Sequence, residues 1–202
     1  MIKNIIFDFG DIFINLDKQG TYKAMAALGV TDITPKMINA YHQYEKGLIS
    51  TEEFIQFFYD EFKIPKEKLV DAWNAVLLDF PKRRLNFLKE LAVSKKYRLF
   101  LLSNTNDLHI KWVQNSLGKE FYSDFKNCFE QFYLSHEINF RKPDSEIYEF
   151  VLQENNLVAS ETLFVDDLKE NTDSAHKLGI HVWNLIPKQE DVTELFLKNK
   201  TL

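Results

Sequence analysis

The chain has 202 residues, enough for one domain or for one core with a small accessory domain. Its 25 basic and 30 acidic residues give a formal net charge of -5, and the sequence contains no basic tract. Nucleic acids and membrane surfaces attract basic patches, so we expect neither as a partner. The apolar runs are also too short to predict a signal peptide or a transmembrane helix.

Cysteine usage points to a reducing compartment. The only cysteine, Cys128, cannot form a disulfide within the chain, and its neighbours include no second thiol or histidine at metal-binding spacing. We therefore expect a cytoplasmic protein. An acidic protein of this kind can still bind an anionic substrate, provided that a metal ion or a few cations are concentrated at one local site.

Four short apolar runs predict strands that are buried on both faces. The first covers residues 2–9, and the others cover 98–102, 162–165 and 180–183, with a weaker candidate at 129–134. Amphipathic helical patterns separate the runs after the first, at 107–117, 145–155 and 169–178. Alternating strands and helices predict an α/β fold with a doubly wound parallel sheet.

The alternation stops between residues 17 and 83, where only helical patterns occur. One of these begins with Ser50 and Glu53, the two halves of a capping box. We expect an all-helical cap of residues 17–83, inserted after the first strand of a core made of residues 1–16 and 84–202. Ligands of such sheets bind beyond the carboxyl ends of the strands, so the cap would lie over the site. The patterns cover 18–28, 35–45, 51–62 and 66–78, and a helix at 82–94 returns the chain to the sheet.

Polar residues follow the predicted strands at the ends that converge in a parallel sheet. Taken singly, each has an ordinary interpretation, because Asp, Ser and Asn often form turns or cap the next helix. Two adjacent acids repel each other unless a cation separates them, so Asp166 and Asp167 indicate a metal site. The groups are Asp8 with Asp11, Ser103 with Asn104, Asp166 with Asp167, and the loop sequence Arg141-Lys142-Pro143-Asp144.

This combination suits phosphoryl transfer through an aspartyl-phosphate, with Asp8 as the nucleophile. Mg²⁺ prefers oxygen ligands from one or two carboxylates together with a substrate phosphate, and the acids here can supply them. Ser103 and Lys142 are expected to take part in catalysis by holding the phosphoryl oxygens. We also expect Asn104 and Asp11 to contact the phosphate of a small phosphate ester.

Together these residues resemble the four motifs of the haloacid dehalogenase superfamily, and the likeness extends from end to end of the chain. The resemblance implies a Rossmann-like core, a helical insertion of the first-cap type and Asp8 as nucleophile. It also implies that Mg²⁺ is held by Asp8, by the backbone carbonyl of Gly10 and by the pair Asp166 and Asp167. Within that pair we favour Asp167 as the direct ligand.

The sequence departs from the superfamily pattern at Gly10. Most phosphatases of the superfamily carry a general acid at this position, two residues after the nucleophile, and Asp11 is displaced by one residue. General acid catalysis is worth about 10²–10⁴-fold, so we expect a leaving group that needs little protonation. The chain resembles the α-D-glucose-1-phosphate phosphatase branch, which implies a small sugar phosphate such as a hexose 1-phosphate as substrate.

Two other functions stay open from the sequence. A metal-independent 2-haloacid dehalogenase would also lack an acid at position 10, although it would have no use for an acidic pair such as Asp166 and Asp167. Alternatively, the chain is a weakly active binding protein with the fold of the superfamily.

Overall fold

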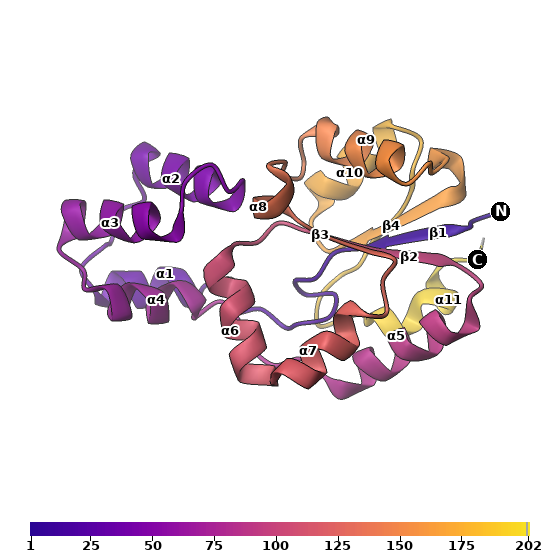
Figure 1. Cartoon of the computed structure of the whole chain (residues 1–202), viewed down its shortest axis with the longest axis horizontal. Coiled ribbons are helices and arrows are strands. Elements are labelled where there is room, and N and C mark those ends of the chain that lie inside the picture. The colour runs from indigo at the N-terminus through magenta and orange to yellow at the C-terminus, as the bar shows by residue number, and fades with distance from the viewer. Residues whose placement is uncertain (201) are drawn as a thin grey trace.

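Five parallel strands form the central sheet of the computed structural model, which describes residues 1–200 and 202 (Figure 1). The sheet order is β3-β2-β1-β4-β5. All the predicted strands are present, with ends that differ from the prediction by one or two residues. They are β1 (Asn4–Phe7), β2 (Arg98–Ser103), β3 (Gln131–Leu134), β4 (Thr162–Asp166) and β5 (His181–Asn184).

Helices cover both faces of this sheet, because successive strand residues point to opposite sides. Ile6 packs under α9 (Ser145–Glu154) and α10 (Lys169–Lys177), whereas Ile5 and Phe7 belong to the cluster on the other face. Figure 1 shows these two helices on one side of the sheet and α5, α7 and α11 on the other. The predicted doubly wound α/β fold is therefore confirmed. The helices of the second face are α5 (Lys82–Ser94), α6 (Asp107–Leu117), α7 (Lys119–Lys126) and α11 (Leu195–Lys198).

The first four helices lie together beside the sheet (Figure 1). They have their own hydrophobic cluster around Phe54, Phe58 and Trp73, to which α6 adds Leu108. The capping box that was predicted at the start of α3 is confirmed, because Ser50 and Glu53 each accept a hydrogen bond from the other's backbone N–H. The four helices are α1 (Gly20–Ala27), α2 (Pro35–Glu45), α3 (Thr51–Phe62) and α4 (Lys66–Asn74).

The fourth of these helices is shorter than its sequence pattern predicts. The pattern runs to residue 78, but α4 ends at Asn74 because the next residues pair with the segment that leaves β1. The backbone N–H of Asp17 bonds the Val76 carbonyl at 2.9 Å, and that of Leu78 bonds the Asn15 carbonyl at 3.0 Å. The two segments that connect the sheet with the four helices, residues 15–17 and 76–78, therefore run side by side.

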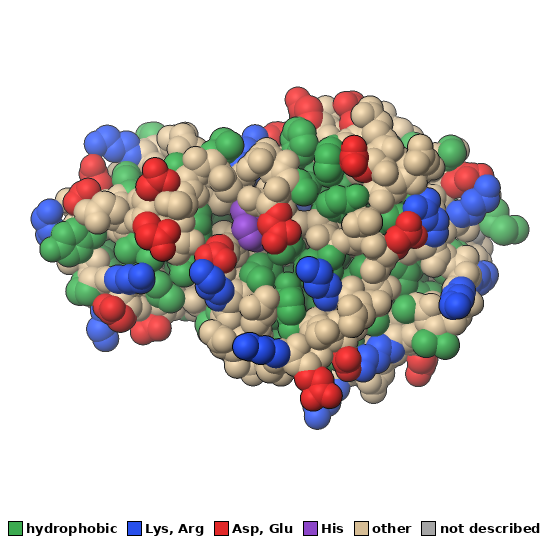
Figure 2. All heavy atoms as spheres, in the orientation of Figure 1, with side chains coloured by type: hydrophobic (Ala, Val, Ile, Leu, Met, Phe, Trp, Pro, Cys, Tyr) green, Lys and Arg blue, Asp and Glu red, His purple; other side chains and the backbone are tan. Residues whose placement is uncertain are grey.

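Charged side chains of both signs are mixed over the face shown in Figure 2. Neither sign gathers there into a large patch. Among the described residues, no helix is both long enough and apolar enough to cross a lipid bilayer.

Candidate active site

A cavity of about 470 Å³ lies where the carboxyl ends of the central strands meet α2 and α6. Asp8 follows β1, Ser103 ends β2, Asp167 follows β4, and Lys142 lies in the loop before α9; all four line the cavity wall. β1 pairs with β2 on one side and with β4 on the other, so the ends of these three strands are neighbours. The topology thus brings together side chains that are far apart in the sequence.

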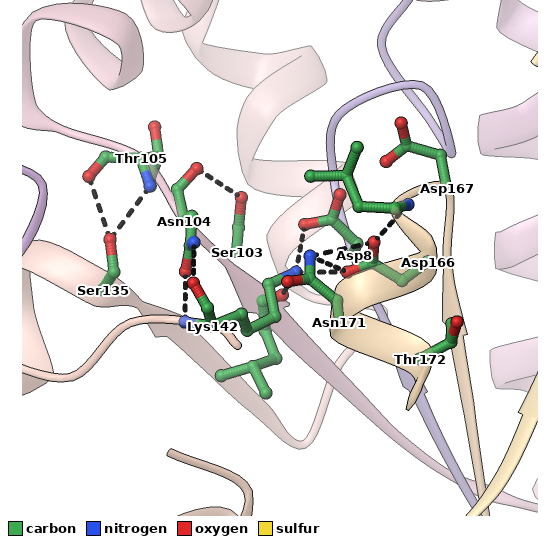
Figure 3. A network of polar contacts seen from close by, with 12 residues as sticks. Asp8, Ser103, Asn104, Thr105, Ser135, Lys142, Asp166, Asp167, Asn171 and Thr172 are labelled. Carbon is green, nitrogen blue, oxygen red and sulfur yellow. Dashed lines mark hydrogen bonds and ion pairs between the residues drawn. The ribbon is translucent and has the colours of Figure 1, made fainter. Parts of the chain in front are cut away.

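Lys142 is the centre of a buried polar network (Figure 3). Its Nζ donates to Asp8 Oδ1 at 2.7 Å, to Asp166 Oδ2 at 2.7 Å and to the Leu102 carbonyl at 2.8 Å. These three bonds use every donor of the ammonium group. Burial alone would lower the pKa of Lys142, but the carboxylates of Asp166 and Asp8 raise it above its ordinary value. The side chain is therefore a fixed positive charge beside Asp8.

Asp8 is held so that one carboxylate oxygen remains free. Its backbone N–H bonds the Val165 carbonyl at 2.9 Å, and its Oδ1 accepts from Lys142. No described residue donates a hydrogen bond to Oδ2, which leaves that oxygen available for attack. Burial raises the pKa of Asp8 to about 7. The negative charges of Asp166 and Asp167 also raise this pKa, whereas the positive charge of Lys142 lowers it. A further cation in the site would favour the ionised carboxylate.

The two adjacent acids after β4 have different surroundings. Asp166 is fully buried; it accepts the Leu168 N–H at 2.8 Å, and the Asn171 amide lies 3.0 Å from each of its oxygens. Asp167 lines the cavity, and its Oδ2 pairs with Lys18 Nζ at 2.5 Å. Both oxygens of Asp166 thus accept hydrogen bonds from protein groups, while Asp167 is paired with a half-exposed lysine.

Three carboxylates could hold a metal ion together. Asp8, Asp166 and Asp167 each offer one oxygen, and these oxygens lie within 4.8 Å of one another. Burial raises the pKa of Asp167, as it does that of Asp8, so a further positive charge in the site would favour the ionised form of both carboxylates. A divalent cation with oxygen ligands matches both the donor set and the charge.

The side-chain amide of Asn104 holds the backbone of Lys142. Its side-chain Nδ2 donates to the Lys142 carbonyl at 2.8 Å, and its Oδ1 accepts the Lys142 backbone N–H at 2.9 Å. The amide therefore fixes the backbone that carries Lys142 (Figure 3). Asn104 also lines the cavity, and its contact with phosphate stays a prediction. Ser103 lines the cavity with its hydroxyl 3.5 Å from the Asn104 carbonyl, at the long limit for a hydrogen bond.

Asp11 is not among the residues that line the cavity, and its contact with phosphate stays a prediction. Its Oδ1 accepts the Leu16 backbone N–H at 3.0 Å, and its Oδ2 lies 3.3 Å from Lys18 Nζ. Gly10 does line the cavity, and a Cβ at this position would approach Leu16 Cδ1 to 2.8 Å. An apolar side chain therefore fills the space beside the position where related phosphatases carry an acid.

Comparison with known proteins assigns the family. The sequence pattern of haloacid dehalogenase-like hydrolases matches residues 5–185. The chain belongs to this family. The D-ribitol-5-phosphate phosphatase of Bacteroides thetaiotaomicron is 31% identical to it over 194 residues, which cover 91% of each protein.

Solved structures of the family share the whole architecture. A haloacid dehalogenase family enzyme from Bacteroides thetaiotaomicron has a TM-score of 0.84 at 33% identity, over 96% of this chain and 98% of that one. The same wild-type enzyme, in complex with magnesium and inorganic phosphate, has a TM-score of 0.82 at 33% identity, over 97% of this chain and 100% of that one. The Rossmann-like fold that the sequence implies is thus shown for this family member.

Several residues of the cavity wall were not predicted from the sequence. Tyr41 and Glu45 come from α2, Arg141 directly precedes Lys142, and His109 comes from α6. Burial lowers the pKa of His109 to about 4, so its ring is neutral. Arg141 adjoins a motif residue, and Tyr41 and Glu45 lie within residues 41–47, where the sequence offers candidates for contacting the substrate but no means of choosing among them. His109 had no sequence signal, because its place in the wall depends on how α6 packs.

Proposed function

We propose that this family member is a Mg²⁺-dependent phosphatase that transfers the phosphoryl group of a small ester to Asp8 and then to water. The observation that carries the proposal is the position of Lys142 Nζ, 2.7 Å from Asp8 Oδ1 and 2.7 Å from Asp166 Oδ2. This arrangement fixes a positive charge beside a carboxylate whose other oxygen is free. The phosphatase name of the Bacteroides relative supports the same chemistry.

In the first step, Asp8 Oδ2 forms a bond to phosphorus while the bond from phosphorus to the ester oxygen breaks. The ester oxygen leaves with a proton from solvent, because Gly10 provides no acid. In the second step, water attacks phosphorus, the bond to Asp8 breaks, and inorganic phosphate leaves. Throughout, Lys142 offsets the repulsion between carboxylate and phosphate, and the Ser103 hydroxyl donates to a phosphoryl oxygen.

Asp8 and Asp167, with the backbone carbonyl of Gly10, are the proposed metal-holding groups. Asp166 supports them from behind the wall while it orients Lys142. Bound Mg²⁺ supplies positive charge to the phosphoryl oxygens. A related structure that contains magnesium and inorganic phosphate supports Mg²⁺ as the ion.

For the substrate we propose a small sugar or polyol phosphate. The relative's name points to D-ribitol 5-phosphate, and the glycine at position 10 favours an acidic leaving oxygen such as that of a hexose 1-phosphate. We propose that residues 17–83 act as a cap over this substrate, because Tyr41 and Glu45 of α2 complete the cavity wall.

The test measures phosphate release from a panel of sugar and polyol phosphates, with Mg²⁺ and with a chelator. We expect release that requires Mg²⁺ and that Asp8→Asn abolishes. Asp17→Asn, at a partly exposed acid outside the catalytic cavity, is the matched control and should retain activity. Release of halide from a 2-haloacid in the presence of chelator would favour the dehalogenase instead. Absence of any turnover above the Asp8→Asn background would leave only a binding protein.

A further inference from the structure

Three side chains on the cavity wall have no role in the phosphoryl chemistry described above. Tyr41 and Glu45 belong to α2, and Arg141 belongs to the loop that carries Lys142. Because Arg141 is the chain neighbour of Lys142, whose Nζ contacts Asp8, the three lie on the wall of the same chamber as the nucleophile. Their chemistry therefore concerns the part of the substrate that leaves.

The three side chains form one hydrogen-bonded cluster. Glu45 Oε1 accepts from the Tyr41 hydroxyl at 2.6 Å, and Glu45 Oε2 accepts from Arg141 Nε at 2.9 Å. Burial is the main reason that the pKa of Tyr41 lies far above its ordinary value, and the negative charge of Glu45 adds to the effect, so the phenol keeps its proton. The Ser135 hydroxyl also donates to the Glu45 backbone carbonyl at 2.6 Å, which anchors the backbone that carries this side chain.

The cluster is buried but electrically neutral. The Glu45 side chain is 4% exposed and that of Arg141 is 18% exposed, and their charges cancel. Burying such a pair costs desolvation free energy that a packed apolar pair would avoid, so stability alone is weak grounds for having it here. A neutral pair also gives no attraction for a second anionic group on the substrate.

Unused donors and acceptors remain on both charged groups. A guanidinium has five N–H donors; Arg141 donates from Nε to Glu45 and also interacts with the Tyr41 hydroxyl, which leaves most of its donors unused. Each Glu45 oxygen accepts one side-chain bond and has a further lone pair. A hydroxyl group is both donor and acceptor, so adjacent hydroxyls match this combination better than an anion or an apolar chain does.

We propose that Glu45 and Arg141, oriented by Tyr41, recognise vicinal hydroxyl groups of the leaving alcohol and so select polyol and sugar phosphates. The proposal rests on the phosphatase function proposed above and names the residues that set its substrate class. An apolar compartment of about 340 Å³ adjoins the cavity and shares Tyr41 and His109 with its wall. An alkyl leaving group would enter that compartment instead, which gives the test its contrasting substrate.

The experiment compares matched esters in which only the hydroxyls differ. D-ribitol 5-phosphate is paired with n-pentyl phosphate, and other four- to six-carbon sugar and polyol phosphates are each paired with the alkyl phosphate of equal carbon number. For the best polyol or sugar ester we expect kcat/KM about 10²-fold or more above that of its alkyl partner, because unpaired buried polar groups reject the analogue. Glu45→Gln and Arg141→Met should each lower this value about tenfold to hundredfold and leave the alkyl ester within about threefold.

Lys46→Gln is the matched structural control. Lys46 Nζ pairs with Asp144 Oδ2 at 2.8 Å, so it joins the same helix to the same loop, but neither residue lines the catalytic cavity. Lys46→Gln should leave the preference between the two esters unchanged. If circular dichroism shows that Arg141→Met does not fold, the test rests on Glu45→Gln alone, because this change keeps the shape and volume of the side chain.

Two results would overturn the proposal while leaving the phosphatase in place. One is equal or better turnover of the alkyl esters by the wild-type chain. The other is a loss in Glu45→Gln that is the same for both members of each pair, or that Lys46→Gln reproduces, because the cluster would then only dock the helix. If the wild-type chain releases phosphate from no ester at all, the phosphatase function itself fails and this proposal fails with it.

Discussion

We propose that Gly10 limits the reaction to esters whose leaving oxygen needs little protonation. A Cβ added at this position would meet Leu16 Cδ1 at 2.8 Å and would lie 3.8 Å from Asp8 Oδ2. The closest obstacle is the end of a flexible side chain, so a larger residue at position 10 requires only that Leu16 change rotamer. The position is therefore close enough to the nucleophile for an acid to serve the same reaction.

We predict that Gly10→Asp increases turnover of esters with poor leaving groups. The gain in kcat/KM for an alkyl phosphate should reach at most about 10²-fold, and an aryl phosphate, whose oxygen needs no proton, should gain little. Steady-state phosphate release on both esters measures this. Gly10→Asn has the same shape without the acid and should show no gain. Equal gains in the two variants would mean that the new side chain acts by shape alone.

Lys18 forms an ion pair with Asp167 and so supplies the positive charge that a bound cation would supply. Its ammonium lies 2.5 Å from Asp167 Oδ2 and 3.3 Å from Asp11 Oδ2, while its side chain is 49% exposed. The Asp167 side chain is only 6% exposed, but Lys18 is long and half exposed, so its ammonium can turn into solvent when Mg²⁺ takes its place. Lys18 would therefore compete with Mg²⁺ for Asp167, the ligand that we favour.

We predict that Lys18→Met tightens Mg²⁺ binding by about twofold to fivefold, because the metal no longer displaces an ion pair. Isothermal titration calorimetry with MgCl₂ alone measures the change without any substrate. Lys23→Met is the control, since Lys23 pairs with Asp17 at 3.7 Å, outside the acidic cluster. Weaker binding in Lys18→Met would show that the lysine supports the metal site instead of competing for it.

At the scale of elements, local patterns predicted most of the fold. The bounds of α2, α3, α5 and α6 agree with their sequence patterns at both ends, since apolar spacing and the Ser50 cap are local signals. The helix predicted to reach residue 78 stops at Asn74, because its last apolar residues pair with a segment about 60 residues away. Helix α7 was missed, although Phe121, Tyr122 and Phe125 have helical spacing.

In the candidate site, too, local patterns predicted some residues, whereas contacts between distant segments were not predictable. Asp8, Ser103 and Asp167 could be predicted because each follows a strand whose end the parallel sheet fixes. The hydrogen bonds of Asn104 to Lys142 and the docking of Glu45 beside Arg141 could not, because they join segments 38 and 96 residues apart. The contact of Glu45 with Arg141 follows only from how the helices before residue 75 pack on the rest of the chain.

The C-terminal segment is joined to the core through Asp191. Its Oδ2 accepts from Arg83 at 2.7 Å and from the largely buried Arg84 at 3.0 Å, and its Oδ1 accepts the Thr193 N–H at 3.1 Å. Burial opposes ionisation of this carboxyl, but these hydrogen bonds outweigh it and lower the pKa of Asp191 to about 2. The ionised form is therefore favoured by the folded state.

We predict that Asp191→Asn lowers the free energy of unfolding by about 1–3 kcal/mol at pH 7, because Arg84 loses its anionic partner. A carboxyl with a depressed folded-state pKa stabilises the fold above its unfolded pKa of about 3.9 and loses this effect as pH falls toward 2. The difference between variant and wild type in urea unfolding should therefore shrink below about pH 4. Asp173→Asn, at an exposed pair with Lys169, should change little at either pH.

At the scale of the whole molecule, the cavity is closed where the helices before residue 75 pack against the rest of the chain. The junction between α2 and α3 rests on α8 (Ser135–Ile138), where a Cβ on Gly47 would come within 2.0 Å of the His136 carbonyl. Neighbouring bonds run from the Asn139 amide to the Lys46 carbonyl at 2.8 Å and from Thr51 Oγ1 to Asp107 Oδ2 at 3.0 Å. Only glycine permits this close approach, and its φ of +65° adds a second reason.

We predict that Gly47→Ala separates α2 from α8, because the methyl group cannot fit against a backbone carbonyl. It should lower stability by more than the roughly 1 kcal/mol expected from a positive φ alone. Displacement of Glu45 and Tyr41 from the wall should also lower kcat/KM for the best polyol ester by up to about 10²-fold.

Gly29→Ala separates the two causes, because Gly29 has a φ of +92° and nothing within 4 Å of an added Cβ. It carries the backbone penalty without the clash, so it should lose stability in thermal unfolding but retain kcat/KM. Equal activity in the two variants would mean that the catalytic cavity does not depend on the contact between α2 and α8. A loss confined to Gly47→Ala would instead tie substrate turnover to the docked position of the helices that precede residue 75.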